Sequence, residues 1–100
     1  MEKNETTLRR EIQALKRKLI GLGDMRPGSV TVQSRKWGGE YCQLSYTHRG
    51  KGHTEYIPKK NRKEVEKQTT NYRRFRELVQ KWVDAEIELC KIKLREADER

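Results

Sequence analysis

The sequence predicts an α+β fold with an N-terminal helix, a three-stranded antiparallel β-meander and a long C-terminal helix. Apolar residues recur every three or four positions near the N-terminus and after Pro58, which is typical of helices. Residues 29–58 are instead rich in Val, Tyr, Thr and Ile and are interrupted by glycines, as in strands and turns. Since the chain has 100 residues, one small domain is expected, with a helix over 5–22, a meander over 29–58 and a helix over 60–97.

The first helix is predicted from a heptad-like apolar seam. Leu8, Ile12, Leu15 and Leu19 are spaced by four, three and four residues, which is the a/d spacing of a coiled coil. Gly21 is expected to end the helix. A helix of this length is marginal alone and needs a packing partner.

The C-terminal helix is predicted from an uninterrupted run of good helix formers after Pro58, without Pro or Gly. Its apolar stripe has three- and four-residue spacing and consists of Val65, Tyr72, Phe75, Leu78, Val79, Trp82, Ala85, Leu89 and Ile92. We expect the two helices to pair as a coiled coil, within one chain or between two chains. The protein interface is expected to include Leu8, Ile12, Leu15, Leu19, Trp82 and Leu89.

The meander is predicted to contain strands over Val30–Lys36, Tyr41–Thr47 and His53–Ile57. A three-residue loop at residues 37–39 would place Val32 opposite Leu44. The third strand is ambiguous, because Tyr56 and Ile57 compete for the core face. The outward face is expected to be polar and to carry Thr31, Gln33, Arg35, Tyr41, Gln43, Ser45 and Thr47.

The net charge of +9 falls on the middle of the chain. Residues 25–76 contain 13 Lys and Arg against 4 Asp and Glu, whereas the two ends carry +2 and −2. A basic block of this kind favours a polyanionic partner, most commonly nucleic acid. It predicts phosphate contacts better than sequence-specific reading of bases.

The candidate nucleic-acid-binding residues are the cations, one histidine and two aromatic residues of this block. Trp37 and Tyr41 are expected to stack on bases if the target is single-stranded. The full set is Arg26, Arg35, Lys36, Trp37, Tyr41, Arg49, Lys51, His53, Lys59, Lys60, Arg62, Lys63, Arg73 and Arg74.

Enzymatic, metal-binding and membrane functions find little support. The chain has no nucleophile or phosphate-loop motif, and Cys42 and Cys90 lie 48 residues apart, unlike paired zinc ligands. No catalytic residue, metal ion or cofactor is therefore expected. The two separate thiols and the lack of a long apolar run predict a reduced, cytoplasmic protein.

Several motifs resemble a family of short uncharacterised bacterial proteins. They are Met25–Val30 (MRPGSV), Leu44–Lys51 (LSYTHRGK), Tyr56–Pro58 (YIP) and Asn71–Leu78 (NYRRFREL). The resemblance implies companions of mobile elements and transposases, which would handle DNA or RNA. The family pattern also has a cysteine-rich insertion between the first two strands. Here one cysteine, Cys42, stands in its place, so no metal site is expected.

Two functions follow from the sequence. The first is a small, non-catalytic nucleic-acid-binding accessory protein, belonging to a larger nucleoprotein or mobile-element system with a transposase or nuclease. The alternative is an interaction or oligomerisation adaptor that docks through its coiled-coil helices, on a partner protein or on a second copy as a homodimer.

Overall fold

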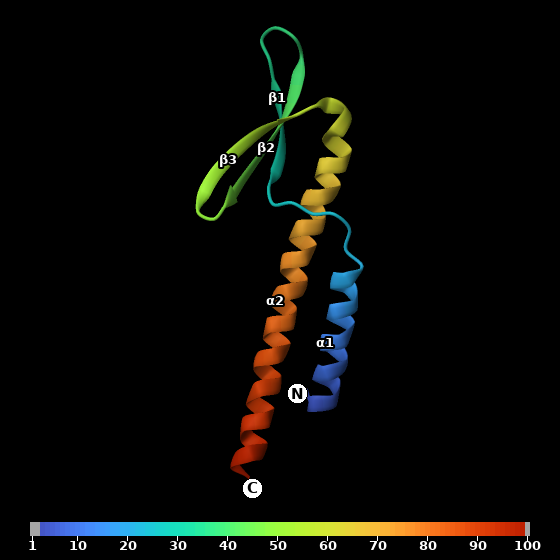
Figure 1. The fold of residues 1–100 in the computed structure, drawn as a ribbon, viewed down its shortest axis with the longest axis vertical. Coiled ribbons are helices and arrows are strands. Elements are labelled where there is room, and N and C mark those ends of the chain that lie inside the picture. Colours follow the sequence, from blue (N-terminus) through green and yellow to red (C-terminus); the bar gives the residue numbers. More distant parts are fainter. Residues whose placement is uncertain (1–2, 100) are drawn as a thin grey trace. The chain divides into compact units, whose positions relative to one another are not determined.

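A computed structural model describes residues 3–99. Along the chain come α1 (Glu5–Ile20), β1 (Ser29–Ser34), β2 (Glu40–His48), β3 (Lys51–Ile57), the 3₁₀ turn η1 (Lys59–Asn61) and α2 (Arg62–Asp98) (Figure 1). The predicted α+β fold and its order of elements are confirmed. Contacts divide the chain into two compact units. The helical unit combines residues up to 22 with those from 75 onward, and the sheet unit is residues 23–74.

In the helical unit, α1 has well-formed ends. The Asn4 side chain accepts a hydrogen bond of 2.8 Å from the Thr7 backbone N–H at the start of the helix. Gly21 is the C-cap, and its N–H donates to the Arg17 carbonyl. The helix therefore ends at Ile20, two residues before the predicted end.

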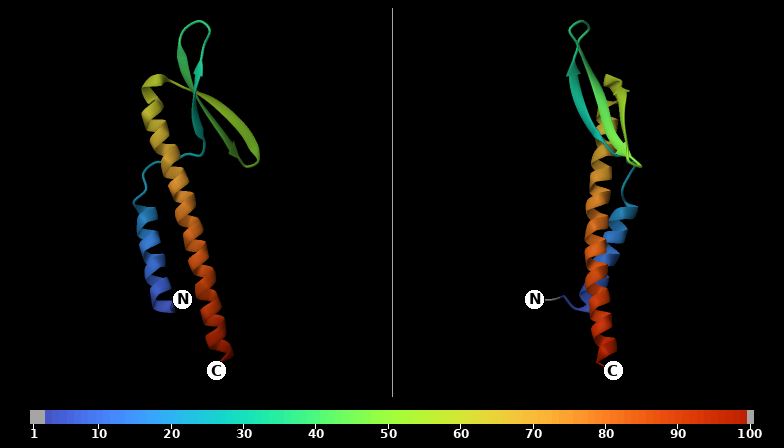
Figure 2. Two further views of the ribbon diagram at one scale, coloured as in Figure 1. Left: turned by 180° about the vertical axis from the view of Figure 1, so that it is seen from behind. Right: turned by 90° about the vertical axis from the view of Figure 1, so that its left-hand side faces the viewer.

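The core of the helical unit lies between α1 and the C-terminal part of α2, which run antiparallel and side by side (Figures 1 and 2). Leu8 and Ile12 of α1 pack with Ala85 and Leu89 of α2, and all four side chains are buried. Trp82 packs against this cluster and is held by a 3.0 Å hydrogen bond from its Nε1 to Glu86. The apolar stripes thus meet within one chain, while coiled-coil geometry stays a prediction.

The sheet has the order β1-β2-β3 with antiparallel neighbours, but its register differs from the expected one. Val32 faces Cys42 and Val30 faces Leu44, so the predicted pairing of Val32 with Leu44 is wrong by two residues. The cause is a turn centred on Trp37, one position earlier than expected. The N–H of Arg35 donates to the Gly39 carbonyl at 2.8 Å across this turn.

The earlier turn shortens β1, which ends at Ser34 rather than at Lys36. Arg35 and Lys36 therefore lie in the hairpin loop. A shift of two residues leaves every side chain on its predicted face, because side chains alternate with a period of two. Cys42 and Leu44 accordingly face the core, as the pattern indicated.

The third strand places Ile57 in the core and Tyr56 on the opposite face. Ile57 pairs with Cys42 and is buried, whereas 60% of Tyr56 is exposed. Cys42, Leu44 and Ile57 form the buried cluster, against which Val65 of α2 packs. Strand β3 begins at Lys51, two residues earlier than expected, because only Arg49 and Gly50 form the turn before it. Both have positive φ, which is typical of a type I′ hairpin turn.

Gly28 positions the start of β1 against the sheet. Its φ is +132°, and a Cβ atom there would lie 2.7 Å from Leu44 Cδ1 and 2.9 Å from the Ser45 carbonyl oxygen. Only glycine adopts this φ readily and also leaves room for Leu44 and Ser45, because it has no Cβ atom. The segment before it is anchored to α2, since Asn71 Nδ2 donates to the Asp24 carbonyl at 2.8 Å.

Candidate nucleic-acid interface

The positive charge belongs to the sheet unit. Residues 23–74 contain 12 Lys and Arg against 5 Asp and Glu, a net charge of +7. The remaining residues, which form the helical unit, contain 12 against 10, a net charge of +2. The electrostatic attraction of this chain for a polyanion is therefore strongest at the sheet unit.

The outward face of the sheet carries a stack of one arginine and two tyrosines. The guanidinium carbon of Arg35 lies 4.5 Å from the ring centroid of Tyr41 and 5.8 Å from that of Tyr56. The two ring centroids are 6.3 Å apart, with 30° between the ring planes. Tyr41 and Tyr56 are diagonal neighbours across β2 and β3, since Tyr56 pairs with Gln43. Guanidinium and phenol groups of this kind provide flat surfaces on which bases stack.

More cations gather at the same end of the sheet. The register places the end of β1, the start of β2 and the end of β3 together. The hairpin loop at this end contributes the exposed Lys36 and Trp37, and 85% of the Trp37 side chain is accessible. The turn after β3 contributes the exposed Lys59 and Lys60. We call this set the stacking end: Arg35, Lys36, Trp37, Tyr41, Tyr56, Lys59 and Lys60.

The opposite end of the sheet holds a smaller basic group. His48 pairs with Lys51 across the turn formed by Arg49 and Gly50, and all of these residues are exposed. The positive φ of Arg49, 51°, is that of a turn residue held by the hairpin. Arg49 and Lys51 thus lie at the far end of the strands from the stacking end.

The cations of α2 form a separate surface. Lys63, Lys67 and Arg74 are exposed and lie within about 40° of one another around the helix axis. Val65, which packs on the sheet, lies about 180° from the middle of this group. These three cations, the helix stripe, therefore face away from the sheet. The structure does not bring the predicted residues Lys63 and Arg74 together with the stacking end.

Two other predicted cations of α2 have partners along the helix. Arg62 Nε donates to Glu66 at 2.9 Å, and this hydrogen bond and the carboxylate charge raise the pKa of Arg62. Arg73 Nη2 donates to the Thr70 hydroxyl at 3.3 Å. Both side chains stay at the surface, but part of the Arg62 charge is matched by its neighbour.

Arg26 lies in a polar network on the core side of the sheet. Its two terminal nitrogens donate to the two Glu55 oxygens at 3.1 and 3.2 Å, and its guanidinium lies 5.0 Å from the Tyr46 ring centroid. The Tyr46 hydroxyl donates to Glu55 at 2.9 Å. Sequence reasoning missed this network. The alternation of β3 would have indicated it, once Ile57 is assigned to the core, because Glu55 then shares its face.

The network shifts the pKa values of two of its members. Hydrogen bonds from Arg26 and Tyr46 lower the pKa of Glu55, because both stabilise the carboxylate. The pKa of Tyr46 is raised by its hydrogen bond to Glu55, because the neutral phenol donates this bond. His53 stacks on Tyr46 with ring centroids 4.8 Å apart. Arg26 and His53 are therefore placed on the other side of the sheet from Tyr41 and Tyr56.

The residues expected at a protein interface pack inside the helical unit. Leu8, Ile12 and Leu89 are buried there, and Trp82 is partly buried. Lys16 Nζ lies 5.3 Å from the Trp82 ring centroid and covers part of it. Leu15 and Leu19 keep partial exposure. A partner chain would have to displace α1 to reach most of this set.

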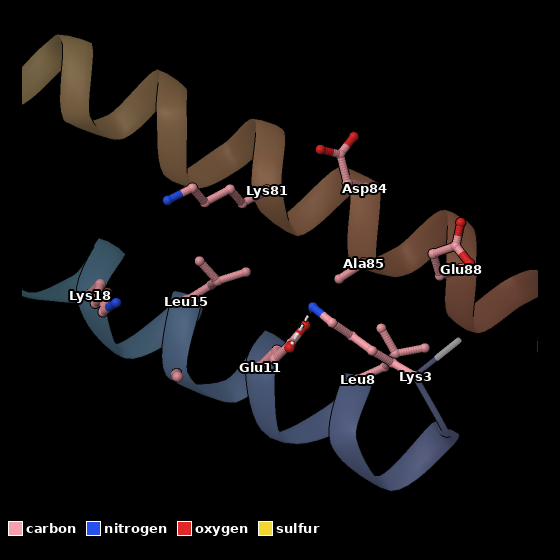
Figure 3. A pocket seen from close by; sticks show the side chains of 10 residues that line it. Lys3, Leu8, Glu11, Leu15, Lys18, Lys81, Asp84, Ala85 and Glu88 are labelled. Carbon is pink, nitrogen blue, oxygen red and sulfur yellow. Dashed lines mark ion pairs between the residues drawn. The ribbon is translucent and has the colours of Figure 1, made fainter. Parts of the chain in front are cut away.

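An open groove of about 870 Å³ runs between α1 and α2 in the helical unit (Figure 3). Its walls carry both signs of charge, and Lys3 forms a 2.7 Å ion pair with Glu11 there. Leu8, Leu15 and Ala85 supply the apolar surface. Cations from both helices, such as Lys18 and Lys81, alternate with carboxylates, so the groove offers no concentration of one charge to a polyanion.

Residues 3–99 contain neither a cluster of metal ligands nor a membrane-spanning helix. No three His, Cys, Asp or Glu side chains in this part of the chain cluster in a way that could hold a metal ion. None of the helices described there has a segment long and apolar enough to cross a membrane. Cys42 is a buried free thiol and Cys90 an exposed one.

Comparison with family models, curated proteins and solved structures finds no match to this chain. The family resemblance of the sequence motifs therefore stays a prediction.

Proposed function

We propose that this chain is a non-catalytic, single-stranded nucleic-acid-binding accessory protein that acts through the stacking end of its sheet. The observation that carries the proposal is the stack of the exposed Arg35 and Tyr56 with the half-buried Tyr41, in a unit of net charge +7. Aromatic rings on an open sheet face favour single strands, because the bases of a duplex are already stacked on one another.

The cations around the stack suit the phosphates of a bound strand. Lys36, Lys59 and Lys60 are exposed, so each can approach a phosphate without loss of an internal contact. Arg49 and Lys51 at the other end of the sheet would hold the strand as it leaves the open face. Such contacts release counterions and give affinity without strong sequence preference.

The role of Arg35 follows from its position over the rings. A base that enters can stack on the free face of the guanidinium or take its place on Tyr41. Trp37, at the tip of the hairpin, offers a further exposed ring. The proposal includes a larger nucleoprotein partner in a reducing cytoplasm, consistent with two free thiols.

The test measures fluorescence anisotropy of labelled single-stranded RNA, single-stranded DNA and duplex DNA. We expect single strands to bind more tightly than duplex, and Tyr56→Ala to weaken single-strand binding about 10-fold, because stacking contributes about 1–3 kcal/mol per base. Tyr56 is largely exposed, so circular dichroism should show an unchanged fold.

Tyr46→Phe is the matched control, since it changes a tyrosine of the same sheet that faces the other side. Binding should then stay at the level of the unmodified protein. An equal loss of binding in both variants, or no single-strand binding at low salt, would contradict the proposal.

A further inference from the structure

α2 carries a second apolar stripe that α1 does not cover. Val83, Ile87, Cys90 and Leu94 follow one another at spacings of four, three and four residues. Val83, Ile87 and Leu94 are 47%, 49% and 62% exposed, and Cys90 is also exposed. At 100° per residue, this stripe lies about 150° around the helix from the side chains that pack against α1.

The spacing of this second stripe is that of a coiled-coil seam. Consecutive steps of four, three and four place all four residues at a and d positions of a heptad. The groove between α1 and α2 is lined by Lys81, Asp84, Ala85 and Glu88, so the second stripe lies outside that groove. A helix with two separate a/d stripes can pack with two helices at once.

The charged residues beside the stripe are complementary to those beside the same stripe in a second copy of the chain. Asp84 and Glu86 flank its N-terminal half, one on each side, and Lys91 and Lys93 flank its C-terminal half in the same way. In an antiparallel pair, each acidic residue lies beside a basic residue of the other copy. Asp84 meets Lys91, and Glu86 meets Lys93.

The distribution of charge along α2 favours an antiparallel pair of helices over a parallel pair. The helix begins with a run of cations between Arg62 and Arg74, and its last turns contain more acidic than basic residues. A parallel pair would place the two basic starts side by side, where they repel. An antiparallel overlap of residues 83–94 places each basic start beyond the end of the overlap.

We propose that Val83, Ile87, Cys90 and Leu94 form an interface through which two copies of this chain associate, with their α2 helices antiparallel. Ile87 of one copy then faces Cys90 of the other, and Val83 faces Leu94. The interface is independent of the nucleic-acid proposal, because it uses neither the sheet nor its cations. A dimer of this kind would present two stacking ends.

The first test is sedimentation equilibrium of the full chain over a range of concentrations. We expect a monomer–dimer equilibrium that Ile87→Glu weakens about 100-fold, because the variant buries a carboxylate in the apolar seam. Ile87 is half exposed within one chain, so circular dichroism should retain its helical signal. Lys81→Gln is the matched control, since it changes the net charge by the same amount outside the stripe and should leave the equilibrium unchanged.

The second test uses disulfide formation to determine whether the two α2 helices are parallel or antiparallel. Cys42 is buried, so Cys90 is the thiol available to an oxidant in the native fold. When Ile87→Cys/Cys90→Ser is mixed with the unmodified protein, mild oxidation should link position 87 of one copy to Cys90 of the other, and mass spectrometry identifies this disulfide. Neither chain of the mixture carries thiols at both positions, so the link between 87 and 90 can form only between two copies. Links of 90 to 90 and 87 to 87 would indicate a parallel pair and overturn the antiparallel assignment.

Two results would overturn the interface itself. One is a chain that stays monomeric at every concentration, which would leave the stripe to a different protein or to none. The other is a dimer that Ile87→Glu and Lys81→Gln leave equally intact, which would locate self-association elsewhere.

Discussion

The helical unit and the sheet unit both have small apolar cores but differ in their charge. Leu8, Ile12, Ala85 and Leu89 form the buried cluster of the first, and Cys42, Leu44 and Ile57 that of the second. The helical unit balances its charges to within +2, whereas the sheet unit keeps +7. Because like charges repel, the excess charge of the sheet unit does not stabilise its fold, and it is the feature on which the proposed nucleic-acid binding depends.

The two units also differ in how their segments are joined. In the helical unit, buried apolar side chains hold α1 on α2, with Leu8 and Ile12 packed against Ala85 and Leu89. In the sheet unit, polar contacts join segments beside the apolar core, since Arg26 donates to Glu55 and Asn71 donates to the Asp24 carbonyl. The helical unit should therefore tolerate substitution of its polar side chains better than the sheet unit does.

The largest expected effect comes from removing one core side chain from each unit. Leu44→Ala and Leu8→Ala should each lower the free energy of unfolding by about 2–5 kcal/mol, because both side chains are fully buried. Hydrogen exchange followed by mass spectrometry locates the loss. Leu44→Ala should expose residues 29–57, and Leu8→Ala should expose residues 5–20. If both variants lose protection from exchange equally over the whole chain, the two units unfold as a single cooperative unit, which would contradict their separation.

The next effect concerns the backbone of the sheet unit. Gly28→Ala should destabilise it by about 1–3 kcal/mol, because alanine is strained at φ +132° and its Cβ would collide with Leu44 and the Ser45 carbonyl. Chemical denaturation gives the magnitude. Gly52→Ala is the control, since a Cβ there meets no atom within 4 Å and its effect should be small. Equal effects at the two positions would disprove the close approach at Gly28.

The polar network of the sheet unit predicts a pH dependence. The pKa of Glu55 is lowered from its usual 4.5, so the folded state favours the carboxylate. This contribution to stability is present above about pH 4.5 and is lost as the pH falls through the lower folded pKa. The pKa of Tyr46 is raised from 10.0, so its contribution is present below about pH 10 and is lost as the pH rises through the higher folded pKa.

Thermal unfolding of the unmodified protein and of Glu55→Gln tests this dependence. The difference in stability between them should be greatest between about pH 5 and pH 10 and should shrink at lower pH. Because the groups are accessible to water, the difference should be modest. A difference that stays constant down to pH 3 would show that Glu55 does not contribute through its charge.

The smallest effect concerns the contact of Lys16 with Trp82 in the helical unit. Lys16→Gln should cost about 0.5–1 kcal/mol, the usual contribution of an exposed cation–π contact. Lys18→Gln is the control, because it removes a cation of the same helix for which no contact with Trp82 is seen. Indole fluorescence during denaturation measures both variants, and identical midpoints would discount the contact.

The sequence predicts the helices better than the sheet, for physical reasons. A helix shows its buried face through spacing alone, so Leu8, Ile12 and Leu89 were found correctly. The order and faces of the strands were also predicted. The register was wrong by two residues, because Trp37, Gly38 and Gly39 permit more than one turn, and only pairing across the sheet selects one.

The candidate site was predicted only in part, since it depends on the fold of the whole sheet unit. Strand alternation predicts the outward positions of Arg35 and Tyr41, but it does not decide whether Tyr56 or Ile57 faces the core. Basic residues that are neighbours in sequence separate in space, because Lys60 follows the sheet while Lys63 lies on the far side of α2. Charge counting along a chain cannot distinguish such surfaces.

The measurement that tests the central claim most directly compares the two basic surfaces of the sheet unit by salt dependence. Binding to a labelled single strand is titrated with salt for Lys36→Gln/Lys59→Gln/Lys60→Gln at the stacking end. The matched variant is Lys63→Gln/Lys67→Gln/Arg74→Gln on the helix stripe. Each variant removes three exposed cations, so their net charges are equal.

We predict that the stacking-end variant lowers the slope of log affinity against log salt by about 2, since each lost phosphate contact on a single strand accounts for about 0.7. The helix-stripe variant should keep the slope of the unmodified protein and lose only a little affinity through its lower net charge. Equal reductions would show that binding follows total charge alone. A larger reduction in the helix-stripe variant would place the nucleic acid on α2 and contradict the assignment of the stacking end.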